Sequence, residues 1–209
     1  NSISEIDLLN MPSLRDLNCG ANLISDLNVS SNLELERLVC SSNLMTSVDL
    51  SQNLVLREAY LGGDNFNSVD LQNNLDLEIL SITAANLFEL DVTNNLNLKE
   101  IGLRFVQLSE LDLSDNDQLE ELVFRSVIAP NLTLENGNLS LIEINESQMS
   151  DLNIIGLTGL TSFRANAAEL NYLNLESIPS IEQIDILGCD ITGLDTRGWP
   201  NPELVQIIS

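Results

Sequence analysis

The chain has 209 residues, 44% of them apolar, and its 8 Lys and Arg against 32 Asp and Glu give a formal net charge of −24. Such an acidic chain is a poor partner for nucleic acid and for anionic membranes, because phosphate groups bind basic surfaces. The absence of histidine removes the commonest general base and the commonest transition-metal ligand, and no apolar run is long enough to cross a membrane.

Short apolar-x-apolar triplets recur from Ile6 to Val205, with steps that alternate between 11 and 10 residues. The repeating unit is therefore 21 residues long and contains two short strands, named A and B here. The A triplets begin at Ile6, Leu27, Val48, Val69, Leu90, Leu111, Leu132, Leu152, Leu173 and Leu194. The B triplets begin at Leu17, Leu38, Ala59, Leu80, Ile101, Leu122, Ile142, Phe163, Ile184 and Val205.

Neither half of the unit has room for a helix of usual length. The pattern predicts a β-rich, flattened solenoid of about ten coils, with one short parallel strand from each half and a sheet on each broad face. At the usual strand spacing the stack is about 48 Å long. No linker interrupts the pattern, so we expect one domain over residues 1–209, cut from a longer protein.

The B half at 35–45, "LERLVCSSNLM", fits the pattern LxxLxLxxNxL. Together with "SVDLSQN" at 47–53, it resembles the leucine-rich-repeat proteins, most closely the 21-residue bacterial kind with nested 10/11 periodicity (IRREKO repeats). The resemblance covers essentially the whole chain. It implies a right-handed solenoid coil with little or no helix, and a binding scaffold of the kind found in internalin-like surface proteins.

Asparagines recur at the corner after strand A, in a series of five at 21-residue intervals. A carboxamide has both a donor and an acceptor, so stacked asparagines can satisfy corner backbone groups from coil to coil. We expect a structural ladder of Asn32, Asn53, Asn74, Asn95 and Asn116.

Aspartates recur on the outward side of the A strands, at Asp49, Asp70, Asp91 and Asp112. They could form a solvated acidic row that shares hydrogen bonds with nearby Ser and Thr. Alternatively they could bind Ca²⁺, which prefers clustered oxygen ligands. The densest cluster is Asp112, Asp115 and Asp117, but a flat strand spreads its carboxylates apart, so we favour the solvated row and expect no metal.

The repeat is irregular around 127–149, where one residue is missing, Pro130 occurs and Gly137 replaces the ladder asparagine. A bulge or kink between coils six and seven, or neutral drift in a tolerant repeat, would explain this irregularity. The three cysteines are too few for a disulfide framework, and we expect Cys19, Cys40 and Cys189 to be reduced.

The outward side chains of the B strands, called the B face here, are varied, whereas those of the A strands are repetitive and acidic. Seven of the eight basic residues lie on or beside B strands, and recognition surfaces favour Arg and aromatic residues. Arg104 and Arg125 should be neighbours and form a small anion site, unless Glu100, Glu121 or Glu143 neutralises them. The candidate ligand-binding residues are Arg37, Tyr60, Arg104, Val123, Arg125 and Arg164.

No catalytic constellation is visible, so we expect a non-enzymatic scaffold without cofactors that binds a protein ligand through the B face. A carbohydrate-binding or structural spacer repeat of a bacterial surface protein is the alternative. The start of the chain lacks the pattern of a leader peptide. We expect a secreted or cell-surface protein whose leader has been removed, or else a cytoplasmic one, with weak self-association through the ends of the solenoid.

Overall fold

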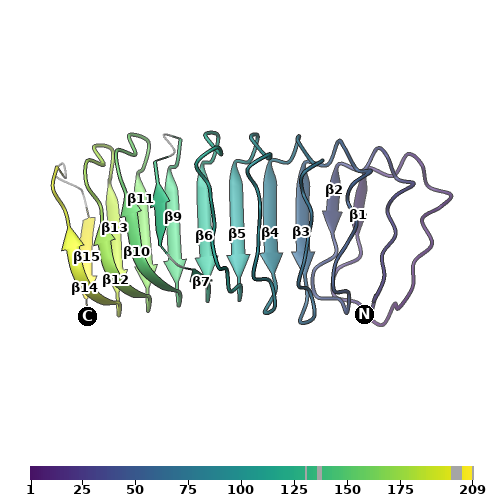
Figure 1. The fold of residues 1–209 in the computed structure, drawn as a ribbon, viewed down its shortest axis with the longest axis horizontal. Coiled ribbons are helices and arrows are strands. Elements are labelled where there is room, and N and C mark those ends of the chain that lie inside the picture. The colour runs from purple at the N-terminus through teal and green to yellow at the C-terminus, as the bar shows by residue number, and fades with distance from the viewer. Residues whose placement is uncertain (130, 136–137, 199–203, 209) are drawn as a thin grey trace.

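The computed structural model describes residues 1–129, 131–135, 138–198 and 204–208. In these residues the chain is an elongated parallel β-solenoid without helices, and its coils follow one another along a single axis from the N-terminus to the C-terminus (Figure 1). This confirms the predicted fold class. None of the described segments is a helix that could cross a membrane.

The B strands form one ten-stranded parallel sheet in which spatial order follows chain order. Neighbouring strands pair in register at 21-residue intervals, except that Leu122 pairs with Ile142, where the missing residue shortens the coil to 20. The strands are β1 (Asp16–Asn18), β2 (Arg37–Val39), β3 (Glu58–Gly62), β4 (Ile79–Thr83), β5 (Glu100–Arg104), β6 (Glu121–Arg125), β9 (Leu141–Asn145), β11 (Ser162–Asn166), β13 (Gln183–Leu187) and β15 (Leu204–Ile208).

The strands form here because the apolar residues of each triplet alternate with outward-facing ones, as a pleated strand requires. Leu38, Leu80, Ile101 and Leu122 are fully or almost fully buried, and their stacking from coil to coil makes one continuous apolar core. Cys19 and Cys40 are buried in this core, and burial raises the pKa of the Cys40 thiol to about 12. All three cysteines are free thiols, as predicted.

The second sheet is restricted to the C-terminal half of the chain. It contains β7 (Ile128–Ala129), β8 (Leu132–Leu134), β10 (Gln148–Ile154), β12 (Glu169–Asn174) and β14 (Asp190–Asp195). β10 pairs with both β7 and β8. In the N-terminal coils the predicted A strands form no sheet, so the prediction of a sheet on each broad face is correct only for the C-terminal coils.

The A segments of the N-terminal coils end in a local turn that is closed by one backbone N–H. In the N-terminal coils it donates to a side chain of its own coil: Ser51 N donates to Asp49 Oδ1 at 2.9 Å, in a local Asx turn. The same bond occurs at Asn28, Asp70, Asp91 and Asp112. It also occurs at Asn174 and Asp195, at the ends of β12 and β14, so the turn by itself does not prevent a sheet. At the equivalent point of β10, Ile155 N instead donates to Leu134 O of the preceding coil, and the sheet continues.

The five asparagines stack at the corner between the A segment and the next B strand, and all five are buried. Each amide reaches back to the preceding coil: Asn74 Nδ2 donates to Leu50 O at 3.1 Å and to Asn53 O at 2.9 Å. The other four asparagines make the equivalent pair of contacts, each to the coil before its own. The ladder thus joins consecutive coils by hydrogen bonds at a corner that lies outside the strands of either sheet.

The sequence irregularity coincides with the change in architecture. Pro130 and Gly137 themselves lie outside the described residues. The flanking residues show that the second sheet begins here, with β7 and β8 on either side of Pro130.

Candidate functional site

The B face presents the first, third and fifth residues of the longer strands. In β5 and β6 the two ends, Glu100 with Arg104 and Glu121 with Arg125, are exposed, and the central residues are half-buried. Side chains in equivalent positions of neighbouring strands lie side by side, at roughly the 4.8 Å spacing of paired strands. The register therefore decides which candidate residues meet.

Arg37 and Tyr60 meet near the N-terminal end of the B face. The Arg37 guanidinium lies 5.4 Å from the centroid of the Tyr60 ring, and it pairs with Glu58 at 3.0 Å and with Asp16 at 3.1 Å. Burial raises the pKa of the Tyr60 hydroxyl, and Glu58 adds to the effect. This cluster is satisfied within the molecule.

Arg164 lies further along the B face, on β11, between two acidic neighbours. It pairs with Glu143 of β9 at 3.0 Å and with Asp185 of β13 at 3.7 Å. Arg164 is therefore neutralised, although it is also aligned with the outward residues of the candidate surface.

Arg104 and Arg125 are direct partners in the register of β5 and β6. The Arg104 guanidinium lies 4.7 Å from the centroid of the exposed Phe105 ring. Of the Arg and Lys side chains in the described residues, Arg104 alone makes no ion pair. Arg125 contacts Glu143 only at 3.9 Å, and that carboxylate lies closer to Arg164.

The two arginines border a cleft of about 420 Å³ at the C-terminal ends of four B strands. The chain turns there through residues with positive φ, including Phe105 at 59° and Ser126 at 53°. These turns place equivalent side chains of consecutive coils next to one another along the cleft. The lining residues are Arg104, Phe105, Arg125, Ser126, Asn145, Glu146, Asn166 and Ala167.

The opposite ends of β5 and β6 are acidic, since Glu100 pairs in register with Glu121. Neither carboxylate makes an ion pair with a described residue. Burial raises the pKa of Glu100, and the like charges of Glu121, Glu120 and Glu58 add to this rise. Between the two ends lie Gly102 and Val123, which form a shallow floor.

The structure thus brings three of the six candidates together, namely Arg104, Val123 and Arg125. Arg37 and Tyr60 form a separate cluster, and Arg164 belongs to a third. Glu143 makes the neutralising contact that the sequence left open, but weakly, and Glu100 and Glu121 lie at the wrong end of the strands to reach the arginines.

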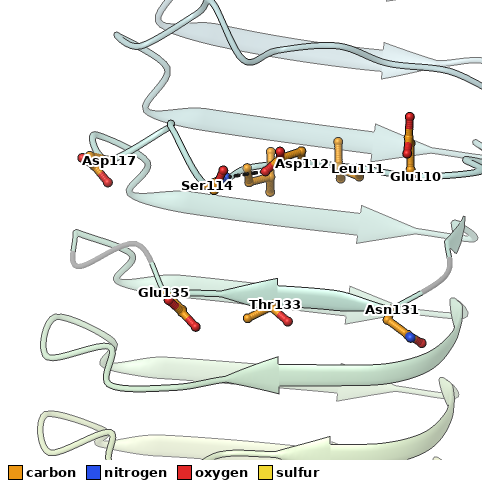
Figure 2. Close-up of a pocket in the computed structure, with 9 residues that line it drawn as sticks. Glu110, Leu111, Asp112, Ser114, Asp117, Asn131, Thr133 and Glu135 are labelled. Atoms are coloured by element: carbon orange, nitrogen blue, oxygen red, sulfur yellow. Dashed lines mark hydrogen bonds between the residues drawn. The ribbon is translucent and has the colours of Figure 1, made fainter.

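The A side contains a larger cleft, of about 630 Å³, between the segment around Asp112 and β8. Figure 2 shows Asp112 next to Ser114, whose amide donates to its carboxylate at 2.9 Å, and Asp117 further along, on the corner. Within the described part of the chain, no group of three or more Cys, Asp or Glu is placed to hold a metal ion. Asp112, Asp115 and Asp117 therefore do not form such a group.

A row of exposed leucines was missed at the sequence level. Leu33, Leu54, Leu75 and Leu96 each follow a ladder asparagine and are 54–58% exposed. The dipeptide Asn-Leu in four successive coils was the available signal, because the ladder needs only the asparagine.

A row of alternating charge just before the B strands was also missed. Arg57 and Lys99 flank Glu78, with contacts of 3.4 Å and 2.6 Å. Each residue of the row also donates its backbone N–H to the carbonyl of the one before it. The row consists of Arg15, Glu36, Arg57, Glu78, Lys99 and Glu120.

No protein-family model and no curated protein matches this chain. Among solved structures, the functional domain of InlJ from Listeria monocytogenes, described as including a cysteine ladder, is similar, with a TM-score of 0.68 and 20% identity. The match covers 90% of this chain and 57% of that domain, so the chain spans little more than half of it.

Two further solved structures match less well. The internalin InlF of Listeria monocytogenes has a TM-score of 0.43 and 17% identity, over 96% of this chain and 80% of that one. A leucine-rich-repeat protein of Leptospira interrogans has a TM-score of 0.36 and 16% identity, over 85% and 67%. The InlJ match, together with the 21-residue register of the strands, shows that this chain has the leucine-rich-repeat fold.

Proposed function

We propose that the chain is a non-enzymatic binding module that recognises a protein partner through the B face. The observation that carries this proposal is the exposed group of Arg104, Phe105 and Arg125. Arginine and aromatic side chains dominate binding hot spots, and these lie at the surface with little or no ion pairing inside the molecule.

The arrangement of charge supports binding over catalysis. Most acidic and basic groups of the B face pair between coils, as Arg37 does with Glu58 and Arg164 with Glu143. Such pairs hold side chains in fixed positions on a rigid sheet, which reduces the entropy lost on docking. A secreted or cell-surface location fits such a module.

Carbohydrate binding or a spacer role is the alternative that the experiment must separate. Tyr60 is already covered by Arg37, which leaves Phe105 as the exposed ring of the B face near polar amides. Sugar sites generally stack on several aromatic rings, so this arrangement favours a protein ligand.

The test uses arrays of surface and extracellular proteins beside an array of glycans, probed with the labelled chain. A B-face variant carries Arg37→Gln, Tyr60→Ala, Arg104→Gln and Arg125→Gln. The control carries Asp49→Asn, Asp70→Asn, Asp91→Asn and Asp112→Asn, which removes charge from the A side but keeps each Asx acceptor. We expect protein binding that the control retains and the B-face variant loses. Binding to glycans alone, or binding that survives in the B-face variant, would overturn the proposal.

We also propose weak self-association of the isolated chain through its terminal coils. β15 pairs with β13 on one side, and Ile207 and Ile208 are exposed. An open parallel edge with apolar residues can pair with another molecule. Sedimentation velocity over a wide concentration range should show a rising mean mass, and a constant monomer mass would refute this.

A further inference from the structure

Two neighbouring strands share a charge pattern that no other B strand has. β5 is "EIGLR" and β6 is "ELVFR", so each begins with glutamate and ends with arginine. Glu100 pairs in register with Glu121, and Arg104 with Arg125. The patch formed by these four side chains, with Gly102 and Val123 between them, is called the dipolar patch here.

The geometry of the dipolar patch follows from strand dimensions. Four residues of parallel strand separate the glutamate row from the arginine row, which is roughly 13 Å. Within each row the backbones lie about 4.8 Å apart. Opposite charges on the patch are therefore too far apart to neutralise one another, and like charges are adjacent.

Adjacent like charges on neighbouring strands destabilise a sheet. Elsewhere in the described chain, the basic side chains are paired with carboxylates: the closest contacts of Arg15, Arg57, Lys99 and Arg197 are 2.7, 3.4, 2.6 and 2.8 Å. In the dipolar patch the repulsion is retained at both ends. A bound partner of complementary charge would relieve it.

The arginine end also has a shape that suits a carboxylate. Phe105 flanks one guanidinium, and the in-register partner of Arg125 on the next strand is Asn145, a further polar side chain bordering the cleft. Glu146 lies at the rim, where its carboxylate accepts a hydrogen bond from Ser126 Oγ at 3.1 Å, and it makes no ion pair with Arg125. Two guanidinium groups side by side can donate jointly to one carboxylate.

We propose that the dipolar patch docks a segment of a protein partner that carries a carboxylate and a cationic side chain roughly 13 Å apart. The carboxylate lies between Arg104 and Arg125, and the cation lies between Glu100 and Glu121. This inference rests on the proposed function of the B face and specifies the chemistry that the face recognises.

A protein segment fits better than a sulfated glycan. A polyanionic glycan would meet both the glutamate row and a molecule of net charge −24. A protein segment can carry both signs of charge at the required separation, and electrostatic complementarity of this kind fixes the orientation of docking.

The test is a nuclear magnetic resonance titration of the ¹⁵N-labelled chain, observed at the arginine Nε–Hε groups. The probes are the capped peptides Lys-Ala-Ala-Ala-Asp and Asp-Ala-Ala-Ala-Lys, whose charges are roughly 13 Å apart when extended. The control peptide, Ala-Ala-Lys-Asp-Ala, has the same charges on adjacent residues. We expect saturable shifts of Arg104 and Arg125 with at least one spaced peptide, and roughly tenfold weaker binding of the control.

Matched variants identify the contacts. Arg104→Gln with Arg125→Gln should weaken the spaced peptide roughly 10- to 100-fold, since each removes charge-assisted hydrogen bonds. With Glu100→Gln and Glu121→Gln, the spaced peptide should bind no more tightly than the control peptide. Arg197→Gln, on the A side, should bind like the wild type. Equal binding of all three peptides, or stronger binding of a sulfated oligosaccharide, would overturn the inference.

Stability separates a binding role from a structural one. Arg125→Gln and Glu121→Gln should melt at or above the temperature of the wild type, because each removes a like-charge pair. A clear fall in the melting temperature of both would indicate a structural role and contradict the inference.

The array experiment distinguishes the two levels of the proposal. The arrays are therefore also probed with Arg37→Gln, Tyr60→Ala and with Arg104→Gln, Arg125→Gln as separate double variants. If an array partner is lost with the first and kept with the second, the B face binds protein and the dipolar patch is wrong. If the peptides bind as expected and no array partner depends on the B face, the patch stands as a charge-selective site and the proposed function fails.

Discussion

The side chain of Asn74 lies in a corner where sheet hydrogen bonds have ended, and it supplies donors to two carbonyls of the preceding coil. Those carbonyls are shielded from water by the stacked coils, because all five ladder asparagines are at most 1% exposed. Each of these carbonyls also accepts a hydrogen bond from a backbone N–H, Leu50 O from Asn53 N at 3.0 Å and Asn53 O from Leu56 N at 3.2 Å. The ladder therefore stabilises the molecule by adding a second buried hydrogen bond to each carbonyl, each contributing about 1 kcal/mol.

Replacing Asn74 by alanine should lower the free energy of unfolding by about 1–3 kcal/mol, because two buried hydrogen bonds are lost. Urea denaturation followed by circular dichroism measures this. Asn97→Ala is the control, since the Asn97 amide also donates to a carbonyl of the preceding coil, Leu75 O, but is exposed. It should cost less than about 0.5 kcal/mol. Equal costs for the two variants would contradict the prediction.

The Asx turns make part of the stability depend on pH. At Asp91, hydrogen bonds from the Thr93 hydroxyl at 2.7 Å and amide at 3.0 Å lower the pKa of the carboxyl group, and Asp49 and Asp112 have lowered pKa values for the same reason. Because the folded pKa is lower than the unfolded one, the stabilisation is present above the usual aspartate pKa of about 3.9. It is lost as the pH falls through the lowered value.

Asp49→Asn with Asp91→Asn and Asp112→Asn should keep the turns, because Asn retains the Oδ1 acceptor, while removing three of the titrating groups. We expect a shallower fall of the melting temperature below pH 4 than in the wild type. Differential scanning calorimetry between pH 2 and 7 would show it, and parallel curves would count against the assignment.

Residue identities predicted these corners well, but not the bond that each side chain makes. Asparagine at fixed phase indicated a buried corner ladder, which the structure contains. An aspartate between apolar residues was predicted to point outward from a strand. The Asp49 carboxylate is indeed exposed, but it also accepts a hydrogen bond from Ser51 N. The sequence pattern is the same whether such a carboxylate is solvated or bonds to the backbone of its own turn.

At the scale of elements, the row of alternating charge stabilises the approach to the B strands. Glu78 pairs with both neighbours, and the hydrogen bond from Lys99 followed by the charges of Lys99 and Arg57 lowers the pKa of its carboxyl group. Glu78→Lys would place three cations side by side. We expect a loss of about 1 kcal/mol at low salt, measured by urea denaturation, and a smaller loss in 0.5 M NaCl. A loss independent of salt would show that packing, not charge, is responsible.

The end of β3 depends on a glycine. Gly62 has φ of +123°, and a Cβ there would lie 2.0 Å from Thr83 O of the next coil. Gly62→Ala should therefore cost roughly 3–5 kcal/mol, because either the backbone or the β3–β4 pairing must shift. Gly156→Ala is the matched control, with φ of +67° and no atom within 4 Å, and should cost roughly 1 kcal/mol by thermal or urea unfolding. A similar loss of stability in the two variants would show that the positive φ alone, and not the contact with Thr83 O, makes Gly62→Ala destabilising.

Elements were predictable where burial decides them. The triplets of the ten-stranded sheet were found because inward residues must be apolar at every coil. The A segments have the same alternation, but only those after Ile128 form a sheet. Apolar spacing fixes which side chains face the core. It leaves open whether a backbone N–H donates to a side chain of its own coil, as Ser51 N does, or to a carbonyl of the preceding coil, as Ile155 N does.

For the whole molecule, the net charge of −24 sets the response to salt. The ion pairs of the alternating row weaken as salt rises, but acidic groups outnumber basic ones by four to one, so relief of repulsion should prevail. Raising NaCl from 10 to 150 mM shortens the screening length from about 30 to about 8 Å. We expect the melting temperature to rise over this range, and a fall would show that the ion pairs dominate.

The candidate site shows the same limit on prediction from sequence. The pairing of Arg104 with Arg125 follows from the 21-residue period alone, and the structure has it. Which carboxylate reaches which arginine depends on side-chain direction: Glu143 turns mainly toward Arg164 and leaves Arg125 at 3.9 Å. The charge pattern common to β5 and β6 was present in the sequence, but its meaning required knowing that its only ion pair in the described residues is the 3.9 Å contact of Arg125 with Glu143.

The backward reach of the asparagine ladder also has a consequence for synthesis on the ribosome. Each ladder amide satisfies carbonyls that left the ribosome 21 and 24 residues earlier, so a coil is completed only when the next corner has emerged. Since chains fold from the N-terminus during translation, each newest coil as far as Asn116 lacks two of its hydrogen bonds until the next ladder asparagine emerges. A pause in translation would therefore leave a single incomplete coil at the growing end, with every earlier coil already closed.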